Sequence, residues 1–203
     1  MCFIFIKAWA WLFSKLCFFP VRIKNKELVD PEEAYIYVSN HNSYLDTFVA
    51  VVAIPKSFKP LGKTEMLKTP IFGLIYRKIV VLIDRKSPES RAKCIQDLKI
   101  ELASGQSILI FPEGTMNRTV TPLAHFYDGA FRLAIETQTP IAPLVIINAR
   151  NLLSRNRPLD AKPGSLSVIL AEPIAVDGLV EADLPKLKEQ VYRVMEELIV
   201  ANS

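Results

Sequence analysis

The chain has 203 residues, half of them apolar, and a formal net charge of +4 at pH 7. This length and composition fit one domain with a sizeable core, or one domain preceded by an anchor. The three cysteines are widely spaced and form neither a disulfide framework nor a zinc-binding pattern, and no recognised nucleic-acid-binding motif accompanies the basic charge, so no nucleic-acid partner is expected.

The first predicted element is an apolar helix within residues 1–20. Of the first 19 residues, 16 are apolar. On a helix, Lys7 and Ser14 fall on nearly one line with Lys15 beside it, so they form a narrow polar stripe on a broad apolar surface. We expect this helix to lie in, or dip into, one leaflet of a membrane, with both lysines reaching the headgroups. An ordinary buried helix is the alternative.

Basic residues follow the apolar segment directly, at Arg22, Lys24 and Lys26. Positive charge beside an apolar anchor favours the anionic cytoplasmic leaflet of a membrane. A solvated basic face is the open alternative. We therefore predict two parts, a membrane-associated helix over residues 1–20 and one folded domain over residues 21–203, located at the cytoplasmic face of the inner (cell) membrane.

In the remaining chain, predicted strands alternate with predicted helices. The strands are expected at Ala34–Ser39, Ile79–Ile83, Ser107–Phe111, Ile141–Ile147 and Leu166–Leu170, and the helices at Leu45–Ala53, Pro88–Ala103, Gly129–Thr137 and Leu184–Val200. This alternation predicts an α/β layered domain with a central, mostly parallel or mixed sheet flanked by helices. In such sheets, sites form where strand ends lead into helices.

The first candidate motif, residues 40–46, stands at such a position. His41 follows a predicted strand, and Asp46 falls in the first turn of the next helix. Histidine has a reference pKa of about 6.5 and suits the removal of a proton from a hydroxyl. A carboxylate on its other ring nitrogen fixes the tautomer and stabilises the imidazolium. Three alternatives stay open: Asp46 only caps the helix, His41 is packed in a loop, or Ser43 acts as the nucleophile of a hydrolase.

The second candidate motif is Phe111-Pro112-Glu113-Gly114-Thr115, after another predicted strand. Gly114 lets the backbone approach a ligand closely. Its neighbouring N–H groups can hold a phosphate or the oxyanion of a tetrahedral intermediate, and Glu113 can accept a hydrogen bond from an acceptor hydroxyl. The alternative is a strand-ending turn with a solvated Glu113. Together the two motifs suggest acyl transfer to a hydroxyl of an anionic acceptor.

Two basic residues are candidates for binding that acceptor. Arg85 closes an apolar strand and can hold a phosphate through two hydrogen bonds, or can simply pair with Asp84. Lys63, in Leu61-Gly62-Lys63-Thr64-Glu65, is the second candidate, and an ordinary surface lysine is its alternative.

The order of these motifs resembles the glycerolipid acyltransferase family. The segments that match are Asn40–Asp46, Lys63–Glu65 with Pro70 and Gly73, Asp84-Arg85, Phe111–Thr115 and Pro140–Leu144. They cover about residues 35–145. The resemblance implies an acyltransferase domain that moves a fatty acyl group from acyl-ACP or acyl-CoA to the free hydroxyl of a lysophospholipid, most directly 1-acyl-sn-glycerol 3-phosphate. The product would be phosphatidic acid, made at a membrane surface.

The resemblance also implies roles for residues. His41 would be the base and Asp46 its partner, while Arg85, Glu113, Gly114 and Thr115 would line the acceptor site. No metal and no cofactor beyond the acyl donor, carried by acyl carrier protein or CoA, would be required.

Two departures from the family pattern concern the acceptor. Family members commonly carry an arginine directly after Glu-Gly-Thr, where this chain has Met116; Arg118, two residues later, is the candidate replacement. A lysine often follows Pro-Phe downstream, where this chain reads His125-Phe126-Tyr127. Both changes remove positive charge near the expected phosphate. Another lysolipid, such as lyso-ornithine lipid, is therefore an open acceptor, and a lysophospholipase or a non-catalytic lipid-binding protein are further alternatives.

Overall fold

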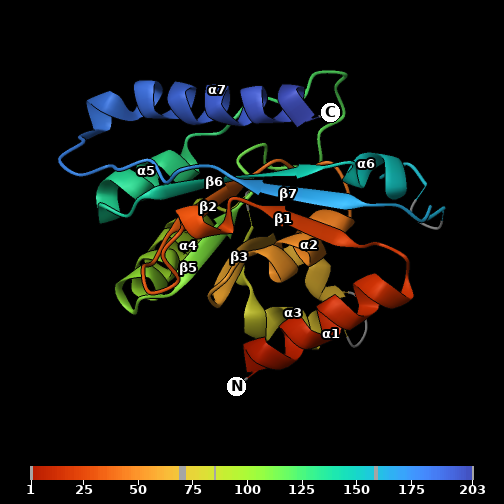
Figure 1. The fold of residues 1–203 in the computed structure, drawn as a ribbon. Coiled ribbons are helices and arrows are strands. Elements are labelled where there is room, and N and C mark those ends of the chain that lie inside the picture. Colours follow the sequence, from red (N-terminus) through yellow and green to blue (C-terminus); the bar gives the residue numbers. More distant parts are fainter. Residues whose placement is uncertain (1, 69–71, 85, 158–159, 203) are drawn as a thin grey trace.

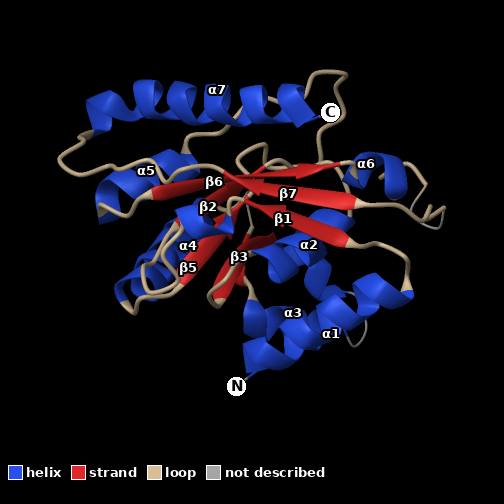
Figure 2. Ribbon diagram, viewed as in Figure 1, coloured by secondary structure: helices blue, strands red, loops and turns tan. Residues whose placement is uncertain are grey.

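The structure is a computed structural model, and it describes residues 2–68, 72–84, 86–157 and 160–202. Within these residues, seven strands form one sheet with helices on both faces (Figure 1, Figure 2). The order across the sheet is β1-β7-β6-β2-β5-β3-β4. Neighbouring strands run parallel, except that β6 and β7 are antiparallel. The predicted α/β domain with a mixed central sheet is confirmed.

The strands are β1 Val21–Lys24, β2 Ile36–Ser39, β3 Phe58–Lys63, β4 Val81–Ile83, β5 Ser107–Ile110, β6 Ile141–Ile147 and β7 Leu166–Leu170. The helices are α1 Cys2–Leu16, α2 Leu45–Ala53, α3 Phe72–Ile79, α4 Pro88–Ala103, α5 Gly129–Thr137, α6 Ala149–Leu152 and α7 Leu184–Asn202. Short 3-10 turns lie at Lys26–Leu28, Thr64–Lys68 and Glu181–Asp183.

Two apolar cores lie on the two faces of the sheet, because successive residues of a strand point to opposite sides. In β2, Ile36 and Val38 belong to the core that contains residues of α4, α5 and α7. Tyr37 belongs to the opposite core, with residues of α2 and α6. Figure 1 shows α7 over one face of the sheet, and α1, α2 and α3 on the other side. Burial on both faces explains why the central strands are continuously apolar.

Helix α1 packs against α2 through its polar stripe. Lys7 Nζ donates hydrogen bonds to the carbonyl oxygens of Ile54, at 2.7 Å, and Pro55, at 3.2 Å, at the carboxyl end of α2. Ser14 is buried on the same side of α1. The prediction that Lys7 reaches the headgroups is therefore wrong. The last carbonyls of a helix lack partners within it, and here the Lys7 ammonium supplies them; burial lowers the pKa of Lys7.

The apolar surface of α1 points away from the rest of the protein. Its large exposed side chains are Phe5, Trp9, Trp11, Leu12 and Leu16, each at least 49% accessible. Lys15 is also exposed, with its ammonium 5.8 Å from the centre of the Trp11 ring. The alternative of an ordinary buried helix is not what this structure shows. Across the described ranges, no helix combines the length and the apolar character needed to cross a membrane.

All the predicted elements are present, and three of the helices and two of the strands have the predicted bounds. The strand predicted at Ile79–Ile83 begins at Val81, because Ile79 is the last residue of α3. Strand β3 was not predicted, since Pro60 and Gly62 argue against a central strand. It nevertheless lies between β5 and β4. Gly62 is needed there because a β-carbon at this position would overlap the Tyr76 side chain.

The topology brings both candidate motifs to one edge of the sheet. Strands β2, β3, β4, β5 and β6 all run in the same direction, so their carboxyl ends meet at that edge. Strands β2 and β5, which lead into the two motifs, are direct neighbours, with Val38 opposite Ile110. This is the edge at which open α/β sheets bind ligands.

Candidate active site

The side chains of His41 and Asp46 are paired as predicted. His41 Nδ1 lies 2.9 Å from Asp46 Oδ2, and Asp46 occupies the first turn of α2. A carboxylate oxygen accepts the hydrogen bond, so the ring proton belongs on Nδ1 and Nε2 is left with its lone pair. The His41 side chain is 19% exposed, and its ring stacks on Phe111 with the centroids 4.3 Å apart. The geometry is that of an oriented base at the protein surface.

The Asp46 carboxylate also organises the loop before α2. Its Oδ2 atom accepts hydrogen bonds from the N–H groups of Asn42, at 2.6 Å, and Ser43, at 2.7 Å. Asp46 is completely buried, and its Oδ1 has no hydrogen-bond partner in the described part of the chain. The capping role and the histidine-orienting role, which the sequence presented as alternatives, are therefore combined on one oxygen atom.

Glu113 binds the backbone N–H of His41 and so fixes the loop that carries it. Its Oε1 accepts from the His41 N–H at 2.7 Å, and its Oε2 accepts from the Ala124 N–H at 2.8 Å. Glu113 is only 3% exposed, so the alternative of a solvated glutamate is wrong. Burial raises the pKa of Glu113, while its two N–H donors act in the opposite direction. Glu113 is therefore placed to position His41, and its contact with the acceptor stays a prediction.

The turn after Glu113 leaves only some of its backbone N–H groups available for the ligand binding that the sequence suggested. Gly114 has a φ of 70°, a left-handed conformation that favours glycine, and its N–H donates to Phe111 O at 2.9 Å. This N–H is therefore used within the turn. Thr115 is exposed, and neither its N–H nor its hydroxyl forms a hydrogen bond within the described ranges. Of the two residues, Thr115 is the one placed to donate to a bound group.

Asn117 is a positioning residue that the sequence did not reveal. Its N–H donates to His41 O at 2.6 Å, so Glu113 and Asn117 hold the N–H and the carbonyl of the same histidine. Asn117 is 5% exposed, and its Oδ1 accepts from the Thr119 N–H at 2.7 Å. The only signal in the sequence was an Asn two residues before a Thr, a pattern typical of an Asx-turn.

Asn40 and Ser43 fix the two ends of the His41 loop. Asn40 Nδ2 donates to Ile146 O at 2.9 Å and its Oδ1 accepts from the Ile146 N–H at 2.8 Å, so its amide continues the pairing with β6. Ser43 Oγ is buried and donates to Leu153 O at 2.6 Å. This hydroxyl is already engaged, which argues against the alternative of Ser43 as a nucleophile.

Two of the three predicted basic residues, Lys63 and Arg118, lie within the described structure. Lys63 is the last residue of β3, and its N–H donates to the Tyr76 hydroxyl. Arg85 lies outside the described residues. Arg118 is exposed, directly after Asn117.

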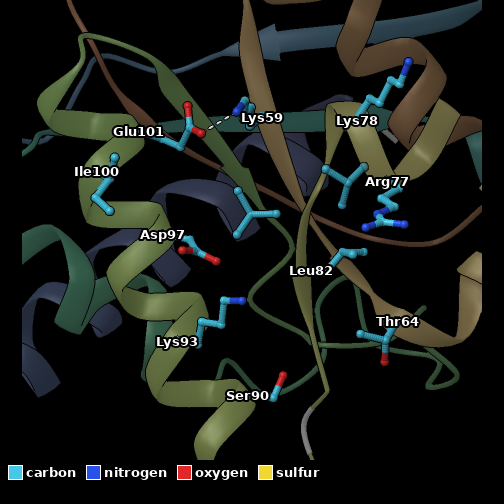
Figure 3. A pocket seen from close by; sticks show the side chains of 12 residues that line it. Lys59, Thr64, Arg77, Lys78, Leu82, Ser90, Lys93, Asp97, Ile100 and Glu101 are labelled. Atoms are coloured by element: carbon cyan, nitrogen blue, oxygen red, sulfur yellow. Dashed lines mark hydrogen bonds and ion pairs between the residues drawn. The ribbon is translucent and has the colours of Figure 1, made fainter. Parts of the chain in front are cut away.

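A separate basic cavity lies at the β4 edge of the sheet (Figure 3). Its volume is about 420 Å³, and it lies between α3, α4 and β4. Four cationic side chains line it: Lys59, Arg77, Lys78 and Lys93. In Figure 3, Lys59 pairs with Glu101, while Lys93 and Asp97 extend from α4. Neither His41 nor Asp46 lines this cavity, which is three strand positions from β2.

The family described as Acyltransferase matches residues 20–147, which include both motifs and all the predicted site residues. The chain belongs to the acyltransferase family. The match confirms the resemblance drawn from the five sequence segments. Helices α1, α6 and α7 and strand β7 lie outside the matched part of this acyltransferase.

Two similar proteins are both described as 1-acyl-sn-glycerol-3-phosphate acyltransferases. The chain is 29% identical over 177 residues to the mouse 1-acyl-sn-glycerol-3-phosphate acyltransferase alpha, covering 86% of this chain and 62% of the mouse protein. It is 31% identical over 170 residues to a chloroplastic 1-acyl-sn-glycerol-3-phosphate acyltransferase of Arabidopsis thaliana, covering 83% of this chain and 47% of that protein. This acyltransferase thus spans about half to two thirds of the length of these curated relatives.

A solved structure supports the fold beyond the family match. The crystal structure of the 1-acyl-sn-glycerophosphate acyltransferase of Thermotoga maritima superposes with a TM-score of 0.79 at 24% identity. The match covers 97% of this chain and 79% of that one. It therefore includes nearly all of this acyltransferase, extending past the part recognised by the family comparison.

Proposed function

We propose that this acyltransferase moves a fatty acyl group from an acyl thioester to the free hydroxyl of 1-acyl-sn-glycerol 3-phosphate, giving phosphatidic acid. The observation that carries the proposal is the His41–Asp46 pair, with Nδ1 bound to a buried carboxylate and the ring partly exposed. The mouse and Arabidopsis relatives are named for this acceptor. Their names support the choice of acceptor, and the geometry supports the reaction type.

The proposed reaction needs one base and one hydroxyl. His41 Nε2 takes the proton from the acceptor hydroxyl as its oxygen attacks the thioester carbonyl carbon. The negative charge of Asp46 stabilises the imidazolium that results. When the tetrahedral intermediate collapses, the carbon–sulfur bond breaks and the thiolate receives the proton from Nε2. The oxyanion of the intermediate would be stabilised by the exposed Thr115 N–H.

The acyl donor in this proposal is acyl-ACP or acyl-CoA, which present the same thioester. Proton transfer by His41 and expulsion of a thiolate require no group beyond these residues and substrates. We therefore propose no metal and no cofactor for the transfer step.

We also propose that the enzyme works on a membrane surface, at the cytoplasmic face of the inner membrane. The support is the orientation of α1, which turns Phe5, Trp9 and Leu16 outward while Lys7 binds the end of α2. An interfacial helix buries its apolar face at the boundary of headgroups and acyl chains. Exposed Arg22 beyond α1 adds attraction to anionic lipid.

A panel of acceptors tests the proposed function. Purified protein in detergent micelles is supplied with labelled acyl-CoA or acyl-ACP and with 1-acyl-sn-glycerol 3-phosphate or lyso-ornithine lipid, and the products are separated. Labelled phosphatidic acid is the expected product. Acylation of lyso-ornithine lipid alone would reject the proposed acceptor, and that outcome is the one suggested by Met116. Release of free fatty acid without an ester product would instead indicate a hydrolase.

A further inference from the structure

A segment distant in sequence is docked directly on the His41 loop. Ser154 forms an antiparallel bridge with Ser43, and Leu153 O accepts the Ser43 hydroxyl from 110 residues away in the chain. This segment follows α6, which itself follows the carboxyl end of β6 at the active-site edge. The next residue, Arg155, is therefore carried to the active site by the fold and not by either sequence motif.

The guanidinium of Arg155 reaches the turn that holds His41. Its Nη1 donates to Met116 O at 3.4 Å. The same peptide group, between Met116 and Asn117, donates its N–H to His41 O at 2.6 Å. One peptide unit thus separates the guanidinium from the His41 backbone, and standard bond lengths put Nη1 within about 8 Å of His41 O.

Arg155 is poorly satisfied by the contacts it makes. It is half-buried, and no carboxylate in the described ranges lies within ion-pair distance of it. A 3.4 Å hydrogen bond to a carbonyl is long and weak, and a guanidinium has five N–H donors. By contrast, Arg157 is exposed and its Nη1 lies 3.5 Å from Asp160 Oδ2. A partly desolvated guanidinium with unused donors favours a bidentate anion.

Two other arginines approach the same turn and are less suited. Arg150 Nη1 donates to Thr119 O at 3.0 Å, and Arg118 follows Asn117, but both are exposed. Solvent screens their charges more strongly than that of Arg155. Met116 itself supplies no charge. Among the described residues, Arg155 is therefore the cation best placed beside the base.

We propose that Arg155 binds the phosphate of the lysolipid acceptor. The inference rests on the proposed function, because it takes His41 as the base that contacts the acceptor hydroxyl. In 1-acyl-sn-glycerol 3-phosphate, the free hydroxyl and the phosphate ester stand on neighbouring carbons. A hydroxyl held at His41 places the phosphate a short distance to one side, and Arg155 flanks the peptide group next to His41.

The test compares Arg155→Gln with the matched control Arg157→Gln. With 1-acyl-sn-glycerol 3-phosphate as acceptor, Arg155→Gln is expected to raise KM about 10- to 100-fold, the loss typical of a charge-assisted hydrogen bond. With uncharged monoacylglycerol, KM should change little, and Arg157→Gln should match the wild type with both acceptors. Arg155→Lys retains the charge but not the paired N–H donors of the guanidinium, and its KM should fall between those of wild type and Arg155→Gln. An equal loss with both acceptors, or no loss with either, would overturn the proposal.

Binding in the absence of a donor separates this inference from the proposed function. Equilibrium binding of labelled 1-acyl-sn-glycerol 3-phosphate to the micellar protein requires no turnover. A 10- to 100-fold weaker Kd in Arg155→Gln, with Arg157→Gln unchanged, supports the phosphate site even if no acyl transfer is observed. An unchanged Kd in Arg155→Gln rejects it even if transfer is confirmed.

Discussion

The two ends of α2 are used in opposite ways. At the amino end, Asp46 and Glu113 are buried, although carboxylates normally face water. Beyond the carboxyl end, which Lys7 binds, α1 exposes Trp9 and Leu16, although large apolar side chains normally face a core. The nine residues of α2 span only about 14 Å. Side chains thus depart from their usual burial near both ends of this helix, and we propose catalysis as the reason for the first departure and lipid contact as the reason for the second.

Each buried polar group at the amino end has a specific use. Asp46 Oδ2 and both oxygens of Glu113 accept hydrogen bonds from the His41 ring or from nearby N–H groups. At α1, by contrast, large aromatic and aliphatic side chains face outward. Hydrogen bonds within the protein hold the first region, although Asp46 Oδ1 has no partner among the described residues, and we propose that a membrane covers the second region.

The largest effect is expected from His41→Ala. Removing a general base lowers turnover by about 10²- to 10⁴-fold. Initial rates with 1-acyl-sn-glycerol 3-phosphate measure the loss, and sedimentation with anionic vesicles should be the same as for wild type. A variant that retained wild-type turnover would refute His41 as the base.

A second large effect is expected at α1. Replacing Trp9 and Leu16 with serine removes two exposed apolar side chains, each contributing about 1.5–3 kcal/mol when fully buried in an apolar phase. The fraction of protein bound to vesicles should fall at least about tenfold. Val200→Ser, on the outer face of α7, is the matched control because Val200 is 65% exposed. Equal loss in the control would show that the effect is not specific to α1.

Glu113→Gln should act on stability as well as on activity. A glutamine amide directs an NH₂ group at one of the two N–H donors that Glu113 now accepts, so the free energy of unfolding should fall by about 1–3 kcal/mol. Urea denaturation measures the change. If stability were unaffected, Glu113 would not be holding the His41 loop.

Comparing the same variant with wild type also shows in which direction the stability contribution of Glu113 changes with pH. Burial raises the pKa of Glu113 above its ordinary value of 4.5. Between pH 4.5 and this raised pKa, the folded protein therefore binds more protons than the unfolded chain. The contribution of Glu113 to stability is therefore full below 4.5 and declines as pH rises through the raised value. The difference in Tm between wild type and Glu113→Gln should narrow over the same window. A difference that widened with pH would contradict the raised pKa.

The smallest effect is expected from Lys7→Met. It removes two hydrogen bonds to the end of α2 and should lower the free energy of unfolding by about 1–2 kcal/mol. Vesicle binding should stay at the wild-type level, since Lys7 faces the protein. Weaker vesicle binding at unchanged stability would restore the headgroup role that the sequence suggested for Lys7.

Local patterns were sufficient to predict the parts of the site that are close together in sequence. His41 and Asp46 are five residues apart, and the strand and helix around them fix their geometry. The strands β2, β5 and β6 were predicted because they are continuously apolar. Strand β3 was not predicted, because Pro60 and Gly62 disfavour a strand locally and the strand forms by pairing with β4 and β5.

The remaining features depend on contacts that no local pattern encodes. The docking of Lys7 on α2 joins residues 47 apart, and Asn117 and Arg155 reach the site only because three loops meet at one sheet edge. Periodicity correctly placed Lys7 and Ser14 on one stripe. It did not indicate whether that stripe faced the protein or the solvent, because both orientations leave the same sequence pattern.

The peptide group between Met116 and Asn117 acts as a molecular ruler. A planar amide has a fixed length, and its two sides bond to the backbone carbonyl of His41 and to the guanidinium of Arg155, so these two groups are kept close to one separation. Acceptors whose hydroxyl and phosphate are set apart by one extra methylene should therefore be discriminated against, even when their charge and acyl chain are identical. Substrate length, as much as substrate charge, would then be selected by the backbone of the enzyme.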